Sequence, residues 1–209
     1  MKFAGEGYPF IGFFAIVTAV VLLAWPAWMA LLPLALTLFM AYFFRDPDRS
    51  VPEGEGIFVS PADGKVIVLQ TVKENQFINE EMLQVSIFMS PLNVHVNRAP
   101  CDGVVGNVVH TSGKFLSAFK PEASLQNENI AMTMNTKYGT ILVKQIAGFL
   151  ARRAVCRVSR GGTLRKGDRY GVIKFSSRVD IFLPLSTVPM VKLGDMVAAG
   201  ETVLGRIQQ

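Results

Sequence analysis

The stretch GGTLRKG, residues 161–167, is followed 33 residues later by GDMVAAG, residues 194–200. Both segments share the pattern Gly-x-x-Leu/Val-x-x-Gly, and each precedes a short apolar run. Glycine adopts backbone conformations that other residues avoid, so glycines at both ends of a short segment indicate tight turns. The echo predicts two similar glycine-bounded hairpins in the last third of the chain. An unrelated pair of hairpins would give the same pattern, and the sequence leaves that alternative open.

Short β-branched or alternating runs occupy most of the chain after residue 50, separated by turn signals such as PADG, PCDG, KYG and GG. Helical periodicity there is confined to residues 113–129. These signals predict a mostly antiparallel β domain, barrel-like or sandwich-like. With SPADGKV (Ser60–Val66) as opening strand, the hairpins resemble the barrel-sandwich fold of lipoyl and biotinyl domains. Strands are expected near residues 57–59, 64–69, 83–89, 103–110, 130–135, 140–146, 154–158, 170–175, 178–183 and 202–207.

Residues 8–44 contain no charged side chain over 37 positions. A bilayer core of about 30 Å is crossed by roughly 20 apolar helical residues, so this run is too long for one upright span. Pro26 divides the run near its middle, between Trp25 and Trp28. Proline interrupts helices and tryptophan favours the membrane interface. The sequence therefore predicts a helical membrane hairpin, either spanning or re-entrant.

We assign the hairpin to residues 1–50 and the β-rich domain to residues 51–209. A cleaved signal peptide and a pair of buried core helices are the competing interpretations, but the apolar core of a signal peptide has only about 7–15 residues. Lys2 precedes the apolar run, and Arg45 and Arg49 follow it. Because positive charge favours the cytoplasmic side, we expect both ends of the hairpin and the β domain to lie on that face of the cell membrane.

The formal net charge is +5, and nine Lys and Arg residues fall between residues 152 and 178 against one acidic residue. A basic surface beside a membrane anchor favours anionic lipid headgroups as partners. Without a nucleic-acid-binding motif, we expect no nucleic-acid partner, and a solvated basic face is the alternative. Two cysteines, Cys101 and Cys156, and two histidines, His95 and His110, are too few for a disulfide framework or a typical zinc site, so no metal is expected.

Four polar positions are candidates for chemistry. Each has an ordinary structural explanation as a turn former, a strand-edge residue, a loop residue or a cap. The candidates are Asp63 in SPADGKV, His95 in SPLNVHVNRAPCDG, Glu128 and Asn129 in LQNENI, and Ser176 and Ser177 in KFSSRVDIFLP.

Taken together, these segments resemble the phosphatidylserine decarboxylase family in its short, membrane-anchored form. YFFRDPDR follows the hairpin, SPADGKV follows the linker, and FMSPLNVHVNRAPCDG precedes GKFLSAF and NEN. IAGFLARRAVC then leads into GDRYGVIKFSSRVDIFLP, so the resemblance covers essentially the whole chain. It implies a pyruvoyl-dependent enzyme that decarboxylates phosphatidylserine to phosphatidylethanolamine.

The resemblance also implies a proenzyme that makes its own prosthetic group by cleavage between Ser176 and Ser177. The Ser177 hydroxyl attacks the preceding carbonyl, β-elimination breaks the resulting ester, and hydrolysis leaves a pyruvoyl group. The products are a membrane-bound β-chain of residues 1–176 and an α-chain of residues 177–209.

By the same resemblance, His95 is the base that activates Ser177, oriented by Asp63. The pyruvoyl carbonyl forms a Schiff base with the substrate amine and withdraws the electron pair that carbon dioxide leaves behind. His95 then returns a proton to the substrate carbon. Arg98 and Arg178 are the candidates for binding the substrate phosphate.

Two positions depart from the family pattern. Longer members carry a second histidine where this chain has Arg98, so both steps depend on His95. The family has glycine at the residue before the processed serine, where this chain has Ser176. We therefore predict that the chain remains unprocessed, whether Ser176 is natural or engineered.

Three alternatives remain open at this point. Archaetidylserine presents the same headgroup as phosphatidylserine, so an archaetidylserine decarboxylase is one. A membrane-anchored lipoyl-like binding module without catalysis is another, although SSRVDIFLPLSTVPM offers no acceptor lysine. A serine hydrolase built on Ser177, His95 and Asp63 is the third, although no nucleophile-elbow motif is present. The oligomeric state is open, with a homo-oligomer among the alternatives.

Overall fold

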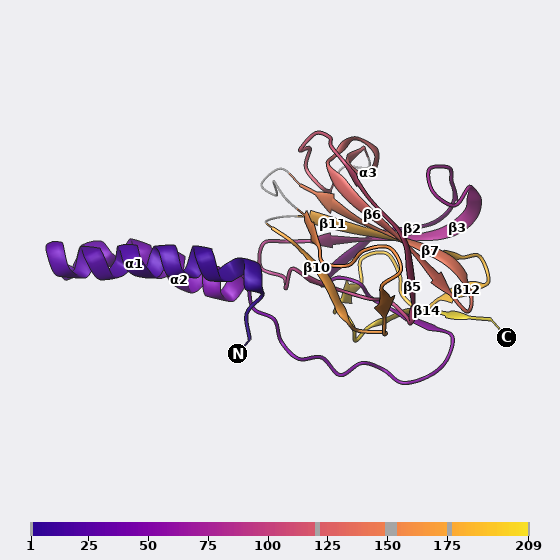
Figure 1. Cartoon of the computed structure of the whole chain (residues 1–209), viewed down its shortest axis with the longest axis horizontal. Coiled ribbons are helices and arrows are strands. Elements are labelled where there is room, and N and C mark those ends of the chain that lie inside the picture. Colours follow the sequence, from indigo (N-terminus) through magenta and orange to yellow (C-terminus); the bar gives the residue numbers. More distant parts are fainter. Residues whose placement is uncertain (1, 120–121, 149–153, 175–176, 209) are drawn as a thin grey trace. The chain divides into compact units, whose positions relative to one another are not determined.

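The computed structural model describes residues 2–119, 122–148, 154–174 and 177–208 (Figure 1). The chain divides into two compact units, Met1–Asp48 and Arg49–Gln209. This division lies close to the expected boundary after residue 50.

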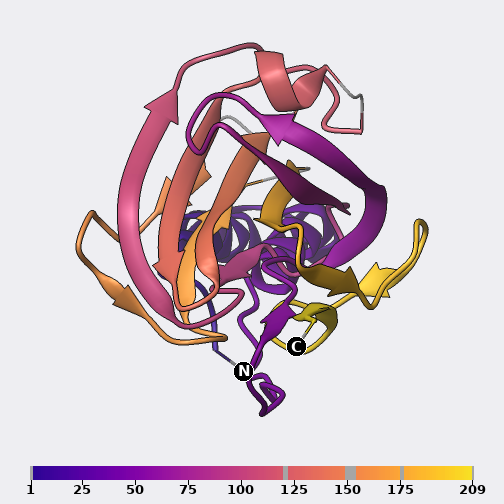
Figure 2. The ribbon, with the colours of Figure 1, turned by 90° about the vertical axis from the view of Figure 1, so that its right-hand side faces the viewer.

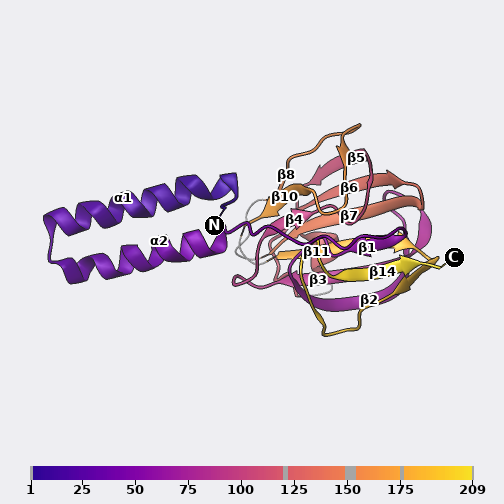
Figure 3. The same ribbon diagram turned by 90° about the horizontal axis from the view of Figure 1, so that it is seen from below.

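The first unit is a pair of antiparallel helices (Figure 3). A 3₁₀ turn, η1 (Gly5–Gly7), precedes α1 (Tyr8–Ala24), and a second, η2 (Ala27–Ala30), precedes α2 (Leu31–Phe43). The hairpin turns where Pro26 was expected to turn it. One polar contact connects the two helices, with Thr18 Oγ1 3.3 Å from Thr37 Oγ1.

Most apolar side chains of this unit are exposed, including Leu23 at 89%. Within the described residues, Gly5–Ala24 is the one helix long and apolar enough to cross a membrane, and Ala27–Phe43 is shorter but equally apolar in character. Exposed apolar surface of this extent is costly in water. The unit is therefore compatible with membrane association.

The second unit is mostly β, as predicted, and every pairing between its named strands is antiparallel. An eight-stranded sheet in the order β13-β2-β3-β11-β7-β6-β5-β9 curls around the core (Figure 2). Two three-stranded sheets, β1-β14-β12 and β4-β10-β8, complete the domain. The strands are β1 (Ile57–Val59), β2 (Gly64–Glu74), β3 (Glu80–Met89), β4 (Val96–Arg98), β5 (Gly103–Thr111), β6 (Asn129–Thr136), β7 (Gly139–Ala147), β8 (Ala154–Cys156), β9 (Thr163–Leu164), β10 (Arg169–Ile173), β11 (Ser177–Pro184), β12 (Thr187–Pro189), β13 (Met196–Val197) and β14 (Val203–Ile207).

Each of the ten predicted strands corresponds to a strand of the structure. The four that the sequence did not indicate, β4, β9, β12 and β13, have only two or three residues each, too few for a periodic pattern. The helical signal across residues 113–129 was largely wrong, because the described residues of that segment (113–119 and 122–129) contain helix only in the single turn α3 (Ala123–Gln126).

The β domain consists of two halves with the same pairing pattern. In one half Ile57 of β1 faces Arg206 of β14, and in the other Val96 of β4 faces Val172 of β10. Both pairs shift register at the corresponding position. The large sheet repeats this relation, since β13-β2-β3-β11 on one side corresponds to β9-β5-β6-β7 on the other. An approximate two-fold axis therefore passes between β11 and β7.

The turns of the two halves use the same chemistry. Asp63 of PADG accepts the Ala199 backbone N–H at 2.7 Å, and Asp102 of PCDG accepts the Lys166 N–H at 2.7 Å. The glycine echo seen in the sequence is confirmed as part of this repeat. Its glycines all have positive φ, the region that favours glycine: 85° at Gly161, 86° at Gly167, 94° at Gly194 and 76° at Gly200.

The core lies inside the curled sheet, and alternate residues of β11 point into it and away from it. Val179, Ile181 and Leu183 belong to the main apolar cluster. Phe182 belongs to a smaller cluster with Met82, on the outer face of the sheet. Adjacent residues of β11 therefore lie on opposite faces of the sheet. Ser177 and Arg178 are separated in this way.

Candidate active site

Ser177 is the first residue of β11 and is fully buried. It lies between Met89 of β3 and Ala147 of β7 in the sheet, and its Oγ donates to Met89 Sδ at 3.4 Å. Its side chain shares the core-facing side of the strand with Val179. Ser176, the other residue of the predicted cleavage site, lies outside the described residues.

His95 lies in the segment between β3 and β4 and is 1% exposed. Its Nδ1 is 2.9 Å from the carbonyl oxygen of Asn93. Its own carbonyl oxygen accepts the backbone N–H of Ile173 at 3.2 Å. Since Ile173 ends β10 four residues before Ser177, this bond ties His95 to the segment that leads into Ser177.

The Asp63 carboxylate binds the guanidinium of Arg49 in addition to the backbone N–H of Ala199. Arg49 Nη2 donates to both carboxylate oxygens, at 2.8 and 3.0 Å, and Arg49 Nη1 donates to Glu201 at 3.0 Å. Burial alone would lower the pKa of Arg49, but the charges and hydrogen bonds of the two carboxylates raise it above its ordinary value. The orientation of His95 by Asp63 stays a prediction, because these bonds direct Asp63 to Arg49 and to the Ala199 N–H.

Arg98, at the end of β4, is buried beneath the glycine turns. Its Nη1 donates to the carbonyl oxygen of Gly167 at 3.1 Å, and a Cβ on Gly200 would lie 2.9 Å from its Cδ. The same Cβ would lie 3.8 Å from Cβ of Arg49. The structure thus gathers Arg98 with Arg49 and its partner Asp63 around the Gly200 turn.

Arg178 lies on the other face of β11 from Ser177. Its Nε donates to Asp180, and its Nη2 donates to Ser86 Oγ of β3 at 2.8 Å. Arg98 and Arg178 were both candidates for binding the substrate phosphate, and their contacts place them in different surroundings. Neighbours in sequence point to opposite sides of a strand, so Arg178 does not share the side of Ser177.

The chain matches the phosphatidylserine decarboxylase family model over residues 36–205. It is 45% identical over 205 residues to the phosphatidylserine decarboxylase proenzyme of Desulfotalea psychrophila, covering 98% of this chain and 96% of that protein. It is 47% identical over 202 residues to the proenzyme of Syntrophotalea carbinolica, covering 96% and 94%. The chain belongs to the phosphatidylserine decarboxylase family.

This member of the phosphatidylserine decarboxylase family also carries polar groups near Ser177 that the sequence did not single out. Gln145 of β7 donates to Asn97 Oδ1 of β4 at 2.8 Å, and Asn97 Nδ2 lies 3.8 Å from Met89 Sδ, the atom bonded to Ser177. Both amides are buried at core-facing positions. A polar residue at an inward position of an alternating strand was the available signal, and Gln145 in TILVKQIA shows it.

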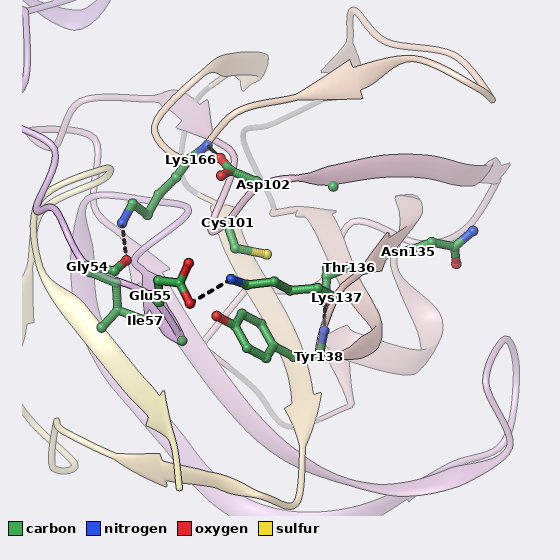
Figure 4. A pocket seen from close by; sticks show the side chains of 12 residues that line it. Gly54, Glu55, Ile57, Cys101, Asp102, Asn135, Thr136, Lys137, Tyr138 and Lys166 are labelled. Atoms are coloured by element: carbon green, nitrogen blue, oxygen red, sulfur yellow. Dashed lines mark hydrogen bonds and ion pairs between the residues drawn. The ribbon is translucent and has the colours of Figure 1, made fainter. Parts of the chain in front are cut away.

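The two-fold relation of the halves also gives His95 and Asp63 counterparts in the other half. Gly56, Asp102 and Lys166 are among the residues that line a pocket of about 350 Å³, and Figure 4 shows Asp102 and Lys166 there. The strand registers make Gly56 the counterpart of His95, and Asp102 the counterpart of Asp63. His95 and Asp63 therefore occupy, in their half, the positions that Gly56 and Asp102 occupy at this pocket.

The thiol of Cys101 at this pocket is not an activated nucleophile. Burial raises the pKa of Cys101 to about 12, so its thiol stays protonated at neutral pH. Lys137 is paired with Glu55 at 3.0 Å (Figure 4). In the described part of the chain, no group of three or more His, Cys, Asp or Glu side chains is arranged to hold a metal ion.

The candidate pair Glu128 and Asn129 lies at the start of β6. Glu128 Oε1 lies 3.2 Å from His110 Nε2, and Asn129 Nδ2 donates to the Asn127 carbonyl at 3.0 Å. These contacts order the segment that enters β6. They give neither residue a contact with Ser177.

Proposed function

We propose that this chain is the proenzyme of a pyruvoyl-dependent phosphatidylserine decarboxylase that forms phosphatidylethanolamine. The observation that carries the proposal is the position of Ser177. It lies buried at the first residue of a central strand, directly after a segment whose backbone is bonded to His95. Family membership over nearly the whole chain supports the same function.

In the proposed processing, Ser177 Oγ attacks the carbonyl carbon of residue 176 and the peptide C–N bond breaks, which converts the amide into an ester. Loss of the Ser177 Cα proton then breaks the Cβ–O bond and releases residues 1–176 with a carboxylate end. The dehydroalanine that remains takes up water and loses ammonia, which leaves a pyruvoyl group on the nitrogen of Arg178. Residues 177–209 become the α-chain.

The surroundings of Ser177 fit this chemistry. Met89 and Ala147 flank it in a water-poor interior, where electrostatic interactions are strong and premature hydrolysis is suppressed. A carbonyl oxygen can only accept, so the bond to Asn93 places the proton of neutral His95 on Nδ1 and leaves Nε2 as the basic nitrogen. His95 is therefore the proposed acceptor of the Ser177 hydroxyl proton.

In decarboxylation, a pyruvoyl group supplies a carbonyl that takes up an amine and withdraws the electron pair released with carbon dioxide. His95 is the proposed donor of the proton that replaces the lost carboxylate. Arg98 is the proposed ligand of the substrate phosphate, because a guanidinium matches phosphate oxygens. The helical hairpin is the proposed membrane anchor, with the β domain on the cytoplasmic side, so the substrate need not leave the bilayer.

Carbon dioxide release from phosphatidylserine vesicles tests the proposed function. We expect release from the processed form of the chain, obtained through a Ser176→Gly substitution, and complete loss after treatment with phenylhydrazine, which captures reactive carbonyls. Release that phenylhydrazine leaves unchanged would point to a site without a pyruvoyl group. Absence of release from the processed chain would refute the proposal.

Asp63 and Asp102 offer a matched test of the proposed role of Asp63, because both accept a backbone N–H at 2.7 Å in equivalent turns. In a Ser176→Gly background, we expect Asp63→Asn to slow processing by at least about tenfold and Asp102→Asn to leave the rate within about twofold. Asparagine keeps an acceptor for each turn but removes the charge. The appearance of the α-chain on denaturing gels gives the rates. Equal slowing in both variants would assign Asp63 a purely structural role.

A further inference from the structure

The outer face of the large sheet contains a second polar pocket, of about 420 Å³, next to Arg178. Its walls come from β2, β3, β7, β11 and the turn α3. Val72 and Phe182 provide apolar surface, and Gln70 and Lys144 provide polar groups. A cavity of this size with a few convergent polar groups is typical of small-ligand sites.

Arg178 has an incomplete set of hydrogen bonds although it is 2% exposed. Its Nε is paired with Asp180 and its Nη2 with Ser86, but its Nη1 has no partner among the residues that the structure describes. A buried donor without an acceptor is destabilising, and the penalty is larger for a charged group. Because Arg178 lines the pocket, an acceptor bound there would lie beside its guanidinium group.

The anionic groups around the pocket are already engaged. Asp180 accepts Ser124 Oγ at 2.6 Å and Gln84 Nε2 at 3.4 Å in addition to Arg178. The carboxylate of Glu74 accepts three backbone N–H groups of the turn that follows β2. The pocket is therefore lined by cationic donors, and these hydrogen bonds of Asp180 and Glu74 do not include Arg178 Nη1.

Lys144 adds a second buried cation to the pocket. Its Nζ donates to Gln76 Oε1 and to the Ser124 carbonyl oxygen, both at 3.2 Å. Both acceptors are neutral, so its charge is not cancelled by a direct ion pair in these contacts. Lys73 lies on the exposed rim of the same pocket.

The two-fold relation shows that the sheet itself does not require these charges. The registers make Thr140 the counterpart of Arg178 and Leu142 the counterpart of Asp180. Leu142 packs in the small outer apolar cluster. Buried ion pairs are rarely more stabilising than apolar residues of similar volume, so retaining Arg178 and Asp180 calls for a reason beyond folding.

We propose that this pocket binds a phosphate group beside the Arg178 guanidinium, with Lys144 and Lys73 supplying further positive charge. The phosphate comes either from the free anion or from the headgroup of an anionic phospholipid. The site is separate from the proposed reaction centre, because Arg178 and Ser177 point to opposite faces of β11. Its existence does not depend on the proposed decarboxylase activity.

Lys73→Glu and Lys65→Glu form a matched pair of variants for the test. Both lysines are exposed on β2 and both variants change the net charge equally, but only Lys73 borders the pocket. The full chain in neutral detergent is titrated at low salt with inorganic phosphate, and separately with water-soluble dihexanoyl phosphatidylglycerol. Phosphorus NMR line broadening reports binding. We expect saturable binding that Lys73→Glu weakens about fivefold and Lys65→Glu leaves unchanged.

The two probes distinguish the source of the phosphate. Binding of inorganic phosphate with this variant pattern supports a free anion, and binding of the lipid probe alone with the same pattern supports a headgroup. Arg178→Lys, which keeps the charge but loses the planar donor fork, should weaken either interaction more than tenfold if circular dichroism shows a native fold. No saturable binding of either probe, or equal weakening by Lys73→Glu and Lys65→Glu, would overturn the proposal.

Discussion

A Ser176→Gly variant is expected to process itself at least about tenfold faster than the unmodified chain. The attacked carbonyl belongs to residue 176, and it must adopt a backbone conformation open to the incoming oxygen of Ser177. Glycine reaches left-handed conformations without the roughly 1–2 kcal/mol that a Cβ adds there, and about 1.4 kcal/mol corresponds to a factor of ten in rate. Denaturing gels and intact mass, followed over time, measure the appearance of the fragment of residues 177–209.

The control is the double variant Ser176→Gly with Ser177→Ala. Alanine has no oxygen that can attack or leave, so this chain should stay at full length indefinitely, although alanine fits the small buried space of Ser177. A fragment from the double variant would exclude Ser177 as the nucleophile. If the unmodified chain were processed as fast as the Ser176→Gly variant, Ser176 would not slow the cleavage.

Asp180→Ala is expected to lower the free energy of unfolding by about 3–5 kcal/mol. The substitution leaves the buried guanidinium of Arg178 without its ion-pair partner and removes an acceptor from Ser124 and Gln84. Removal of one member of a buried pair is costly because the remaining charge stays desolvated. Urea unfolding of the full chain in detergent measures the change in the free energy of unfolding. The circular dichroism signal of the β domain monitors the transition.

Asp195→Ala provides the comparison, because Asp195 is exposed and its carboxylate accepts a local turn N–H, from Lys192. Its effect should stay below about 1 kcal/mol. The double variant Arg178→Met with Asp180→Leu should recover most of the stability, since neutral residues occupy the equivalent positions of the other half. A small effect of Asp180→Ala would show that the pair is not desolvated as the structure indicates.

The sequence predicted those parts of the fold that depend on local chemistry. The paired glycines around residues 161–167 and 194–200 required positive φ, which marks a turn wherever it occurs. Pro26 and the apolar residues around it predicted the helical hairpin, because proline interrupts a helix. The two-residue strand β9 was beyond prediction, because it exists only through pairing with β5.

The roles of the candidate site residues stay predictions, and the structure shows how their segments are arranged. Ser177 and His95 were identified from their segments, and the structure ties these segments through the Ile173 backbone. The partner of Asp63 was not foreseen, because Arg49 lies in a linker without periodic pattern. The side of β11 on which Arg178 lies could not be predicted, because a strand's alternation has meaning only after its register and its buried face are known.

The place of β11 has a consequence for a chain cut before Ser177. The new terminus would begin a strand enclosed by β3 and β7, while β13 and β14 of the same fragment pair with β2 and β1. Dissociation would have to open the large sheet and a small one together. The two pieces would therefore migrate as one particle in gel filtration, and once separated by denaturant they would reassemble at a rate that depends on concentration. The intact precursor folds as a single molecule, so its folding does not require two separate pieces to meet.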